Sequence, residues 1–260
     1  MSKKYELTNE TKTLADGTVL HRIRALRNIP RFGVKAGELG GFVEEENNLS
    51  QDGYAWVSGN AKVYGKAWVF DNAEVSGNAE VSGNAKVSGN AWVSGNARVY
   101  GNADVSGDAW VSVNAEVFGD AKVYGNARVS GNAWVYGNAE VFGDAEVSGD
   151  AWVFNNARVS GNAEVYGYAR VSGDAEVSGN AEVSAISDYM VIKNTWSSGR
   201  WFTYTRSNKK WAVGCFYGTG EELVAKAYKD SELSGRCYEA IVRAVETIEA
   251  AKAEAKGDAK

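Results

Sequence analysis

The sequence predicts a mainly β protein whose central part is a parallel β-helix of triangular coils. Three observations predict this fold: a six-residue period, small and aliphatic residues at fixed places, and glycine near the end of each repeat. From Ala55 to Ser184 the chain repeats Ala-x-Val-x-Gly-Asn without insertion or deletion. Ala opens all 22 repeats, Val fills the third place in all 22, and Gly fills the fifth place in 18 of the 21 complete repeats. A short period of this kind is typical of a stacked solenoid.

Each hexad predicts one short strand and one corner. Strand alternation sends Ala and Val inward and both x residues outward, while Gly-Asn accepts the left-handed or turn dihedral angles of a corner. Three strands close one triangular coil, so the 22 hexads predict just over seven coils. The asparagines should then stack as ladders along the corners.

The outward charges support a register of three hexads per coil. On two predicted faces, residues three hexads apart alternate in sign, as stacking requires, because like charges directly opposite each other destabilise a sheet. One series runs Lys62, Glu80, Arg98, Glu116, and the other runs Lys86, Asp104, Lys122, Glu140, Arg158, Glu176.

A candidate interaction ridge combines four aromatic residues at the second outward position of one face with two tryptophans at the first outward position beside them. Its six residues are Tyr100, Phe118, Tyr136, Phe154, Trp134 and Trp152. An exposed apolar strip marks a surface that another chain, or the protein's own C-terminal helix, covers. Stacking of a sugar or another planar ligand is the alternative. We expect solvent on the small, polar face that carries Ser58, Ser76, Ser94, Ser112, Ser130 and Ser148.

A slower period of seven hexads favours duplication of a block of the solenoid, with chance recurrence of a few markers as the alternative. It relates Trp68 to Trp110 and Trp152, Trp92 to Trp134, and the non-glycine corners Asp71, Val113 and Asn155 to one another. Because seven hexads are not a whole number of coils, each copy is rotated by one face. The duplicated tryptophans should therefore not line a single groove.

Residues 1–54 predict a hairpin and a cap. Two strands, Tyr5–Leu14 and Thr18–Arg27, flank an Asp16-Gly17 turn, which is a hairpin signal. Residues 40–43 then lead into Leu49, one hexad before Ala55, so an irregular first coil should cover the end of the solenoid.

A basic patch lies in this segment. Its residues are Arg22, Arg24, Arg27, Arg31 and Lys35. We expect a solvated strand face opposed by Glu44, Glu45 and Glu46, with an acidic partner as the alternative.

Residues 185–260 predict a separate α+β module, after the hairpin and cap (1–54) and the solenoid (55–184). Strands are expected at Tyr189–Lys193, Arg200–Arg206 and Trp211–Tyr217. A capping box at Thr219–Glu222 begins a helix at about 220–230. A second helix at about 235–255 should pack on the module's own sheet or along the ridge through one apolar stripe, formed by Tyr238, Ile241, Val242, Val245 and Ile248.

Composition narrows the function. The sequence has no apolar run long enough to span a membrane and no apolar start typical of a signal peptide, so we expect a cytoplasmic protein. Cys215 and Cys237 are too few for a disulfide framework and are expected to be reduced packing residues. The solenoid carries 8 basic and 15 acidic residues, which disfavours nucleic acid as a partner.

The flanks carry a family resemblance. The segments Leu20–Leu26, Val34–Val43 and Asn48–Ser50, followed by the hexads, together with Val213–Thr219 near the end, resemble phage- and prophage-encoded hexapeptide-repeat proteins of unassigned role. The resemblance implies a left-handed β-helix. Such proteins are often labelled acyltransferases or polymer-forming proteins by their repeat, but a fold does not give a function.

Catalysis is the minority hypothesis. Hexapeptide-repeat acyltransferases use a histidine base and commonly an inserted loop, whereas the only histidine is His21 and the hexads have no insertion. We therefore predict no catalytic residue, metal or cofactor. The predicted function is a non-catalytic scaffold that binds a host protein or a small ligand through the outward aromatics or the C-terminal module, or self-associates, for example as a homotrimer. A diverged acyltransferase is the alternative.

Overall fold

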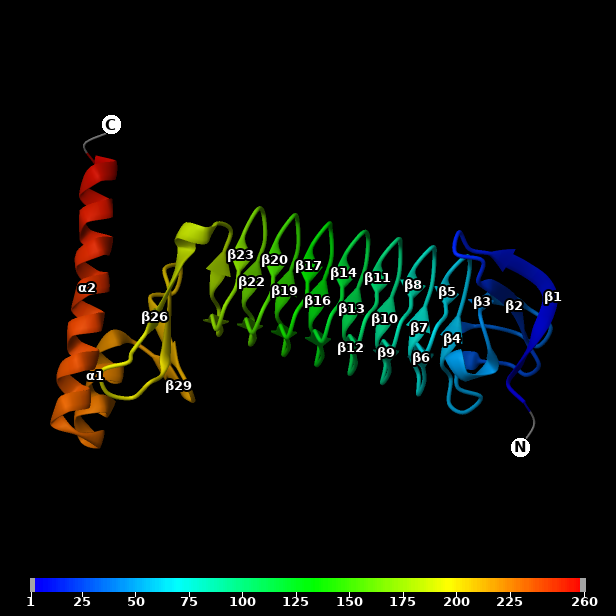
Figure 1. Ribbon diagram of the computed structural model, residues 1–260, viewed down its shortest axis with the longest axis horizontal. Helices are drawn as coiled ribbons and strands as arrows, with labels where there is room; N and C mark the ends of the chain where they lie inside the picture. The colour runs from blue at the N-terminus through cyan, green and yellow to red at the C-terminus, as the bar shows by residue number, and fades with distance from the viewer. Residues whose placement is uncertain (1–2, 258–260) are drawn as a thin grey trace. The chain divides into compact units, whose positions relative to one another are not determined.

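The computed structural model describes residues 3–257. The chain divides into two compact units, Met1–Ile186 and Ser187–Lys260. The first unit contains the solenoid, drawn in cyan to green in Figure 1, and the second contains an antiparallel sheet and two helices.

The solenoid consists of two-residue strands stacked in three parallel sheets, which we name by their first hexad strand. The β5 face contains β5 (Lys62–Val63), β8 (Glu80–Val81), β11 (Arg98–Val99), β14 (Glu116–Val117), β17 (Trp134–Val135), β20 (Trp152–Val153) and β23 (Arg170–Val171). The β4 face contains β4 (Trp56–Val57), β7 (Glu74–Val75), β10 (Trp92–Val93), β13 (Trp110–Val111), β16 (Arg128–Val129), β19 (Glu146–Val147), β22 (Glu164–Val165) and β25 (Glu182–Val183). The β6 face contains β6 (Trp68–Val69), β9 (Lys86–Val87), β12 (Asp104–Val105), β15 (Lys122–Val123), β18 (Glu140–Val141), β21 (Arg158–Val159) and β24 (Glu176–Val177).

The strand pairing confirms the predicted register of three hexads. Arg98, for example, pairs with Glu80 on one side and Glu116 on the other. Backbone hydrogen bonds follow the same step: the N–H of Glu80 donates to the Ala97 carbonyl at 2.9 Å, and the N–H of Asn84 donates to the Gly101 carbonyl at 2.7 Å. Strands and corners of one coil are therefore both bonded to the next coil.

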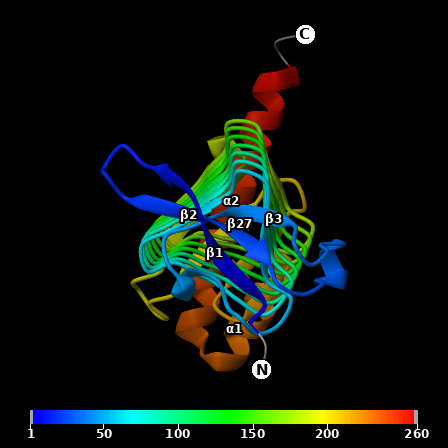
Figure 2. The ribbon, with the colours of Figure 1, turned by 90° about the vertical axis from the view of Figure 1, so that its right-hand side faces the viewer.

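The core contains the two invariant residues of the hexad. Every Ala and Val at the first and third hexad places is at most 1% exposed. The view along the solenoid shows the stacked coils as one triangular outline (Figure 2). Because the outline keeps its size from coil to coil, side chains of constant volume fill it at native packing density.

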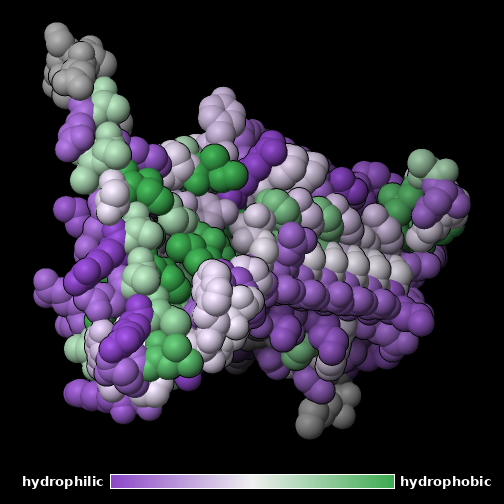
Figure 3. All heavy atoms as spheres, turned by 60° about the vertical axis from the view of Figure 1, so that its left-hand side comes forward, coloured by the Kyte–Doolittle hydropathy of each residue, from purple (hydrophilic) through white to green (hydrophobic). Residues whose placement is uncertain are grey.

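The corners adopt left-handed backbone angles. The 18 corner glycines have φ between 63° and 74°, and the non-glycine corners Asp71, Val113 and Asn155 have φ of 56°, 65° and 61°. The following asparagines form the predicted ladders, as where Asn84 Nδ2 donates to Asn102 Oδ1 at 2.8 Å. Figure 3 shows such corners as parallel rows of near-neutral and hydrophilic residues along the solenoid.

The N-terminal segment adds one irregular coil, which confirms the predicted cap. Strand β3 (Leu39–Val43) pairs in parallel with β5, and Leu49 forms a parallel bridge with Val69. The hexads alone give eight strands on the β4 face and seven on each of the other two faces. Because β3 and Leu49 each add one position to those two faces, the solenoid has about eight turns rather than just over seven. The 3-10 helices η1 (Pro30–Phe32) and η2 (Glu46–Asn48) lie on either side of β3 in sequence.

The predicted hairpin closes the sheet of the β5 face. Strand β1 (Tyr5–Thr13) pairs antiparallel with β2 (Val19–Ala25), and β2 pairs antiparallel with β3. The register of the hairpin shifts between Leu7 and Thr11. A bulge of this kind adds twist and bends the strand.

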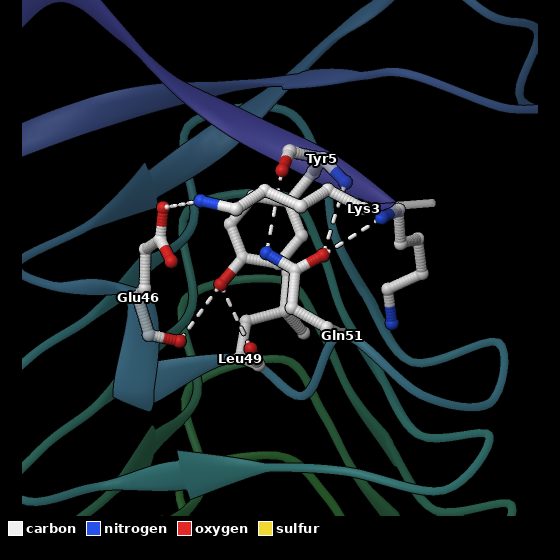
Figure 4. Close-up of polar contacts among 6 residues, drawn as sticks. Lys3, Tyr5, Glu46, Leu49 and Gln51 are labelled. Atoms are coloured by element: carbon white, nitrogen blue, oxygen red, sulfur yellow. Dashed lines mark hydrogen bonds and ion pairs between the residues drawn. The ribbon is translucent and has the colours of Figure 1, made fainter. Parts of the chain in front are cut away.

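Buried polar groups attach the start of β1 to the first coil (Figure 4). The Tyr5 hydroxyl lies 2.8 Å from the carbonyl oxygens of both Glu46 and Leu49 and donates its proton to them. The Gln51 side chain accepts from the N–H of Tyr5 at 3.3 Å and donates to its carbonyl at the same distance. Lys4, which is fully buried, donates to the Ala55 carbonyl at 2.8 Å.

The second unit contains an antiparallel sheet of four strands and two helices within its described residues. The strands are β26 (Tyr189–Lys193), β27 (Trp201–Thr205), β28 (Lys210–Val213) and β29 (Phe216–Gly218), in that order across the sheet. The single strand predicted at Trp211–Tyr217 was wrong. Gly214 adopts φ of 59° and turns the chain, so that Val213 pairs with Phe216.

Both helices pack on this sheet. Helix α1 (Gly220–Asp230) begins with the predicted capping box, in which the Thr219 hydroxyl accepts from the N–H of Glu222. Helix α2 (Glu232–Gly257) contributes the predicted stripe to the sheet's core, including Tyr238, whose ring meets that of Phe202 edge-on at 4.7 Å. Ile248, at the end of the stripe, is 40% exposed and lies beyond the core.

Replacing Val113 by Gly should stabilise the solenoid. A β-branched residue at φ of 65° is strained by about 1 kcal/mol or more, and the Val113 side chain is 51% exposed. We expect Val113→Gly to raise the free energy of unfolding by about 1 kcal/mol, measured by urea unfolding. The converse control, Gly107→Val, should lower it, because a Cβ at Gly107 would lie 2.9 Å from the nitrogen of Gly125. An unchanged or lower stability of Val113→Gly would contradict this account.

Tyr5→Phe should destabilise the cap at neutral pH by about 1–2 kcal/mol, since the carbonyls of Glu46 and Leu49 lose the donor they share and the contact with Leu49 is buried. Burial raises the pKa of Tyr5. Above the ordinary tyrosine pKa of about 10, the unfolded chain loses a proton that the folded chain keeps, so wild-type stability falls with pH. This alkaline loss should be smaller in Tyr5→Phe than in the control Tyr54→Phe, whose parent residue is 44% exposed. Equal alkaline slopes in unfolding experiments would refute the prediction.

Candidate functional site

The structure brings the six residues of the candidate interaction ridge together on the β5 face. The rings of Tyr100, Phe118, Tyr136 and Phe154 stack in series at centroid distances of 4.8, 4.9 and 5.1 Å, within 4° of parallel. Trp134 and Trp152 stack beside them at 5.0 Å. These distances match the spacing of about 4.8 Å between neighbouring strands, so the coil itself sets the ring spacing.

The ridge rings bury much of their surface against one another. All six residues are half-buried. Guanidinium groups lie at both ends, with Arg98 at 5.3 Å from the Tyr100 ring and Arg170 at 4.5 Å from the Trp152 ring. The Tyr100 hydroxyl donates to Glu116 Oε2 at 2.9 Å, and burial raises the pKa of Tyr100 to about 12. The ridge therefore presents a strip of ring edges to solvent.

The charge series form ion pairs between coils. Lys62 pairs with Glu80 on the β5 face, and Arg98 lies 3.9 Å from Glu80 and 3.4 Å from Glu116. On the β6 face, Arg158 lies 3.5 Å from Glu140. Exposed pairs of this type contribute about 0–1 kcal/mol each, so their main effect is on register.

The basic patch has other partners than expected. Arg22 pairs with Glu10 at 2.9 Å and Arg24 with Glu6 at 3.4 Å, because β1 lies beside β2. The expected opposition by Glu44, Glu45 and Glu46 was wrong: Glu46 pairs with Lys3 at 2.7 Å, and Glu44 accepts from the N–H of Gly65.

The rest of the basic patch is spread over loops. Arg27 donates to the Gly53 carbonyl at 3.3 Å, Arg31 lies over the Phe32 ring at 5.7 Å, and Lys35 is exposed. Hydrogen bonds and β1 carboxylates thus engage several of the five side chains, so they do not form one uniform anion-binding surface.

The sequence has one histidine, His21, and two cysteines, which were predicted to be packing residues. His21 is half-buried on β2, and its Nδ1 lies 3.3 Å from the Thr8 carbonyl. Cys237 is half-buried against the core of the second unit. Cys215 is exposed, so its predicted packing role was wrong, since the turn after Gly214 carries it to the surface.

The β4 face was expected to carry small polar residues and to face solvent. It contains an open groove of about 680 Å³. Its lining comes from helix η1, from the first outward position of the face and from the neighbouring corner: Arg31, Phe32, Asn72, Glu74, Asn90, Ala91, Trp92, Asp108 and Trp110. The sequence contained the signal, because Trp92 and Trp110 are three hexads apart. In the seven-hexad repeat, Trp92 corresponds to Trp134, and Trp110 corresponds to Trp68 and Trp152. Trp92 and Trp110 are therefore not copies of each other and can share a face, whereas the copies of one tryptophan cannot.

Two rings at right angles form the apolar part of this groove. The rings of Trp92 and Trp110 meet at 4.9 Å with an interplanar angle of 80°. Trp92 Nε1 donates to Ser76 Oγ at 2.9 Å, which fixes the orientation of that ring. Trp110 is 46% exposed. Burial raises the pKa of Glu74, which accepts a hydrogen bond from Ser58.

A third feature lies in the second unit and was not predicted. The loop of residues 194–199, which we name the Trp196 loop, is organised by the fully buried Asn194. Asn194 Oδ1 accepts from the N–H groups of Trp196 at 3.1 Å and Ser197 at 3.3 Å, and Asn194 Nδ2 donates to Ser197 Oγ at 2.9 Å. Trp196 itself is 68% exposed.

Two features are absent from the described residues, a metal-holding cluster and a membrane-spanning helix. Among residues 3–257, no group of three or more His, Cys, Asp or Glu side chains has a geometry that could hold a metal ion. Over the same range, neither helix combines the length and apolar character that crossing a bilayer requires.

Comparison with known families agrees with the strand pairing. Three segments match the YdcK Beta solenoid repeat. The matched residues are 97–112, 121–137 and 157–173. They all lie within the solenoid and include Tyr100 and Tyr136 of the ridge and Trp110 of the groove. The match concerns the repeat and implies no activity. No curated protein matches the chain.

The ridge should stabilise the solenoid in proportion to the number of ring stacks. Phe118 stacks on two neighbours, Tyr100 and Tyr136, whereas Phe142 on the β6 face stacks only on Tyr124 among the described rings. Each aromatic pair contributes about 0.5–1.5 kcal/mol beyond area burial. Phe118→Ala should therefore lower the free energy of unfolding by about 1 kcal/mol more than Phe142→Ala. Equal losses in urea unfolding would show that stacking is not what stabilises the ridge.

Proposed function

We propose that this chain is a non-catalytic β-solenoid scaffold that binds a protein partner through the Trp196 loop of its second unit. The observation that supports this most is the contrast between a 68% exposed Trp196 and the fully buried Asn194 that organises its loop. Exposing an indole to water is unfavourable, and here the hydrogen bonds that Asn194 Oδ1 accepts from the backbone N–H groups of Trp196 and Ser197 order the loop that carries it.

A fixed, exposed tryptophan suits protein recognition. Tryptophan is enriched among residues that dominate binding energy, and an anchor ordered before binding loses less conformational entropy on association. Close by in sequence, Trp201 is 38% exposed, and Lys193 Nζ lies 4.7 Å from its ring centroid. The second unit thus offers a second exposed tryptophan, Trp201, whose ring has a cation over it.

The ridge is the less favoured contact. Its ring faces are engaged by neighbouring rings and by Arg98 and Arg170, so a partner would meet ring edges rather than a pocket or an anchor. A flat strip of this kind is better suited to self-association, including a homotrimer. Given the resemblance to phage-encoded proteins, we expect the partner to be a bacterial cytoplasmic protein, such as a defence or metabolic enzyme.

The acyltransferase alternative would have to use His21, since this is the only histidine in the sequence. His21 lies on β2, where its Nδ1 faces the Thr8 carbonyl. No geometry at His21 favours this alternative over the scaffold. Incubation with acyl-CoA donors and mass spectrometry would reveal turnover, and loss of that turnover in His21→Ala would support the alternative.

The proposal predicts that Trp196→Ala abolishes capture of a partner from bacterial lysate, as quantified by mass spectrometry. A hot-spot tryptophan contributes about 2 kcal/mol or more, so recovery should fall at least about tenfold. The matched control is Tyr168→Ala, which removes an 81% exposed ring from a solenoid corner. Asn194→Ala keeps Trp196 but loosens the loop and should reduce recovery less than Trp196→Ala.

Two results would reject the Trp196 loop as the contact. One is unchanged recovery with Trp196→Ala. The other is loss of the same partners in a Tyr136→Ala/Phe154→Ala variant while Trp196→Ala retains them, which would assign binding to the ridge. The solution mass of that ridge variant, compared with wild type by light scattering, tests self-association separately.

A further inference from the structure

The groove on the β4 face is not used by the proposed function. It lies in the first unit, whereas the Trp196 loop lies in the second. Its lining residues come from η1 and from the hexads of the β4 face with their neighbouring corners. It leaves Trp110 46% exposed with the ring of Trp92 beside it at 4.9 Å, so its lining includes aromatic surface that a ligand can contact.

The apolar part of the groove has the shape of a corner. Trp92 and Trp110 meet at 80°, so one ring can lie under a ligand while the other borders it. Trp92 is fixed by its hydrogen bond to Ser76, and Arg128 lies 5.9 Å from the Trp110 ring centroid. A compact ring with an apolar face fits such a corner better than an extended chain does.

The polar part is a ladder of amides that ends in a carboxylate. Asn72 Nδ2 donates to Asn90 Oδ1 at 3.3 Å, and Asn90 Nδ2 donates to Asp108 Oδ1 at 2.8 Å. Each amide group has two N–H donors and two acceptor lone pairs, so each rung leaves both donor and acceptor capacity at the surface. Hydroxyl groups, which donate and accept at once, match this alternation.

The charges of the lining select against strongly charged ligands. Of the lining residues that the structure describes, Arg31 is the one cationic side chain, and Glu74 and Asp108 are the two carboxylic acids. A phosphate group or a cation would each meet both signs of charge in this lining, so each would bring one pair of like charges together. Like charges brought together in a partly desolvated groove are repulsive, so a neutral ligand fits best.

We propose that the groove on the β4 face binds the pyranose ring of a neutral saccharide. The apolar C–H face of the sugar stacks on Trp110 beside Trp92, and its hydroxyl groups bond to the ladder of Asn72, Asn90 and Asp108. The groove is open and its polar contacts are few, so the dissociation constant is on the order of 1 mM. This inference is independent of the partner that contacts the Trp196 loop.

Three neutral disaccharides test the proposal: cellobiose, maltose and N,N′-diacetylchitobiose. Saturation-transfer NMR and tryptophan fluorescence on the full chain should detect at least one of them at about 10 mM, tenfold above the expected dissociation constant. Trp110→Ala should weaken that sugar's binding at least about tenfold, and Trp110→Phe, which keeps a stacking ring, should retain most of it. The matched control is Trp68→Ala, since Trp68 is 42% exposed but lies on the β6 face.

The outcomes separate the possibilities. Binding that is lost in Trp110→Ala and kept in both Trp110→Phe and Trp68→Ala supports the saccharide site. The proposal is overturned if none of the three sugars binds the wild-type chain, or if Trp68→Ala reduces binding as much as Trp110→Ala. It is also overturned if adenosine monophosphate or choline binds at Trp110 while the sugars do not. Circular dichroism of each variant confirms that the solenoid is folded.

Discussion

Backbone hydrogen bonding between successive coils is the constraint on which the rest of the first unit depends. In the regular hexads, outward residues and sixth-place corner residues donate their N–H groups to carbonyls about one coil further along, at 2.7–3.1 Å. This ladder requires every coil to have the same length and every corner to turn at the same angle. Glycine at φ near 70° meets that requirement without side-chain strain, and alanine and valine keep the enclosed core uniform.

The same constraint explains why the surface is ordered in columns. Once the backbone step is set at three hexads, side chains stack by position, and their chemistry decides how each column behaves. Columns of asparagine become amide ladders, columns of alternating charge become ion-pair series, and the column from Tyr100 to Phe154 becomes a stack of parallel rings. On the β4 face, Trp92 and Trp110 have small serines beside them, and their rings meet edge-on. On the β5 face, Trp134 and Trp152 have aromatic neighbours, and their rings lie parallel to each other.

The hexad was sufficient to predict strand positions, register, core and ridge, because each of these depends only on residues three hexads apart. The flanks carry no such period. The groove depends on how Arg31 and Phe32 are placed by η1, and the partners of the basic patch depend on β1 and on the bulge between Leu7 and Thr11. The split of the last predicted strand depends on one glycine, Gly214, and Trp196 was missed because its loop is organised by a single buried amide. The handedness of the solenoid stays a prediction from the resemblance.

The seven-hexad repeat has an evolutionary consequence. Seven hexads are two coils and one extra side, so copying them moves each residue to the adjacent face. The pair Trp92 and Trp110 recurs seven hexads later as Trp134 and Trp152. The first pair lies in the groove beside η1, and the second lies beside the stack of ridge rings. Duplication of a seven-hexad block would thus give the same two side chains new neighbours. In a prism with three sides, the length of an insertion can diversify a surface before any point mutation does.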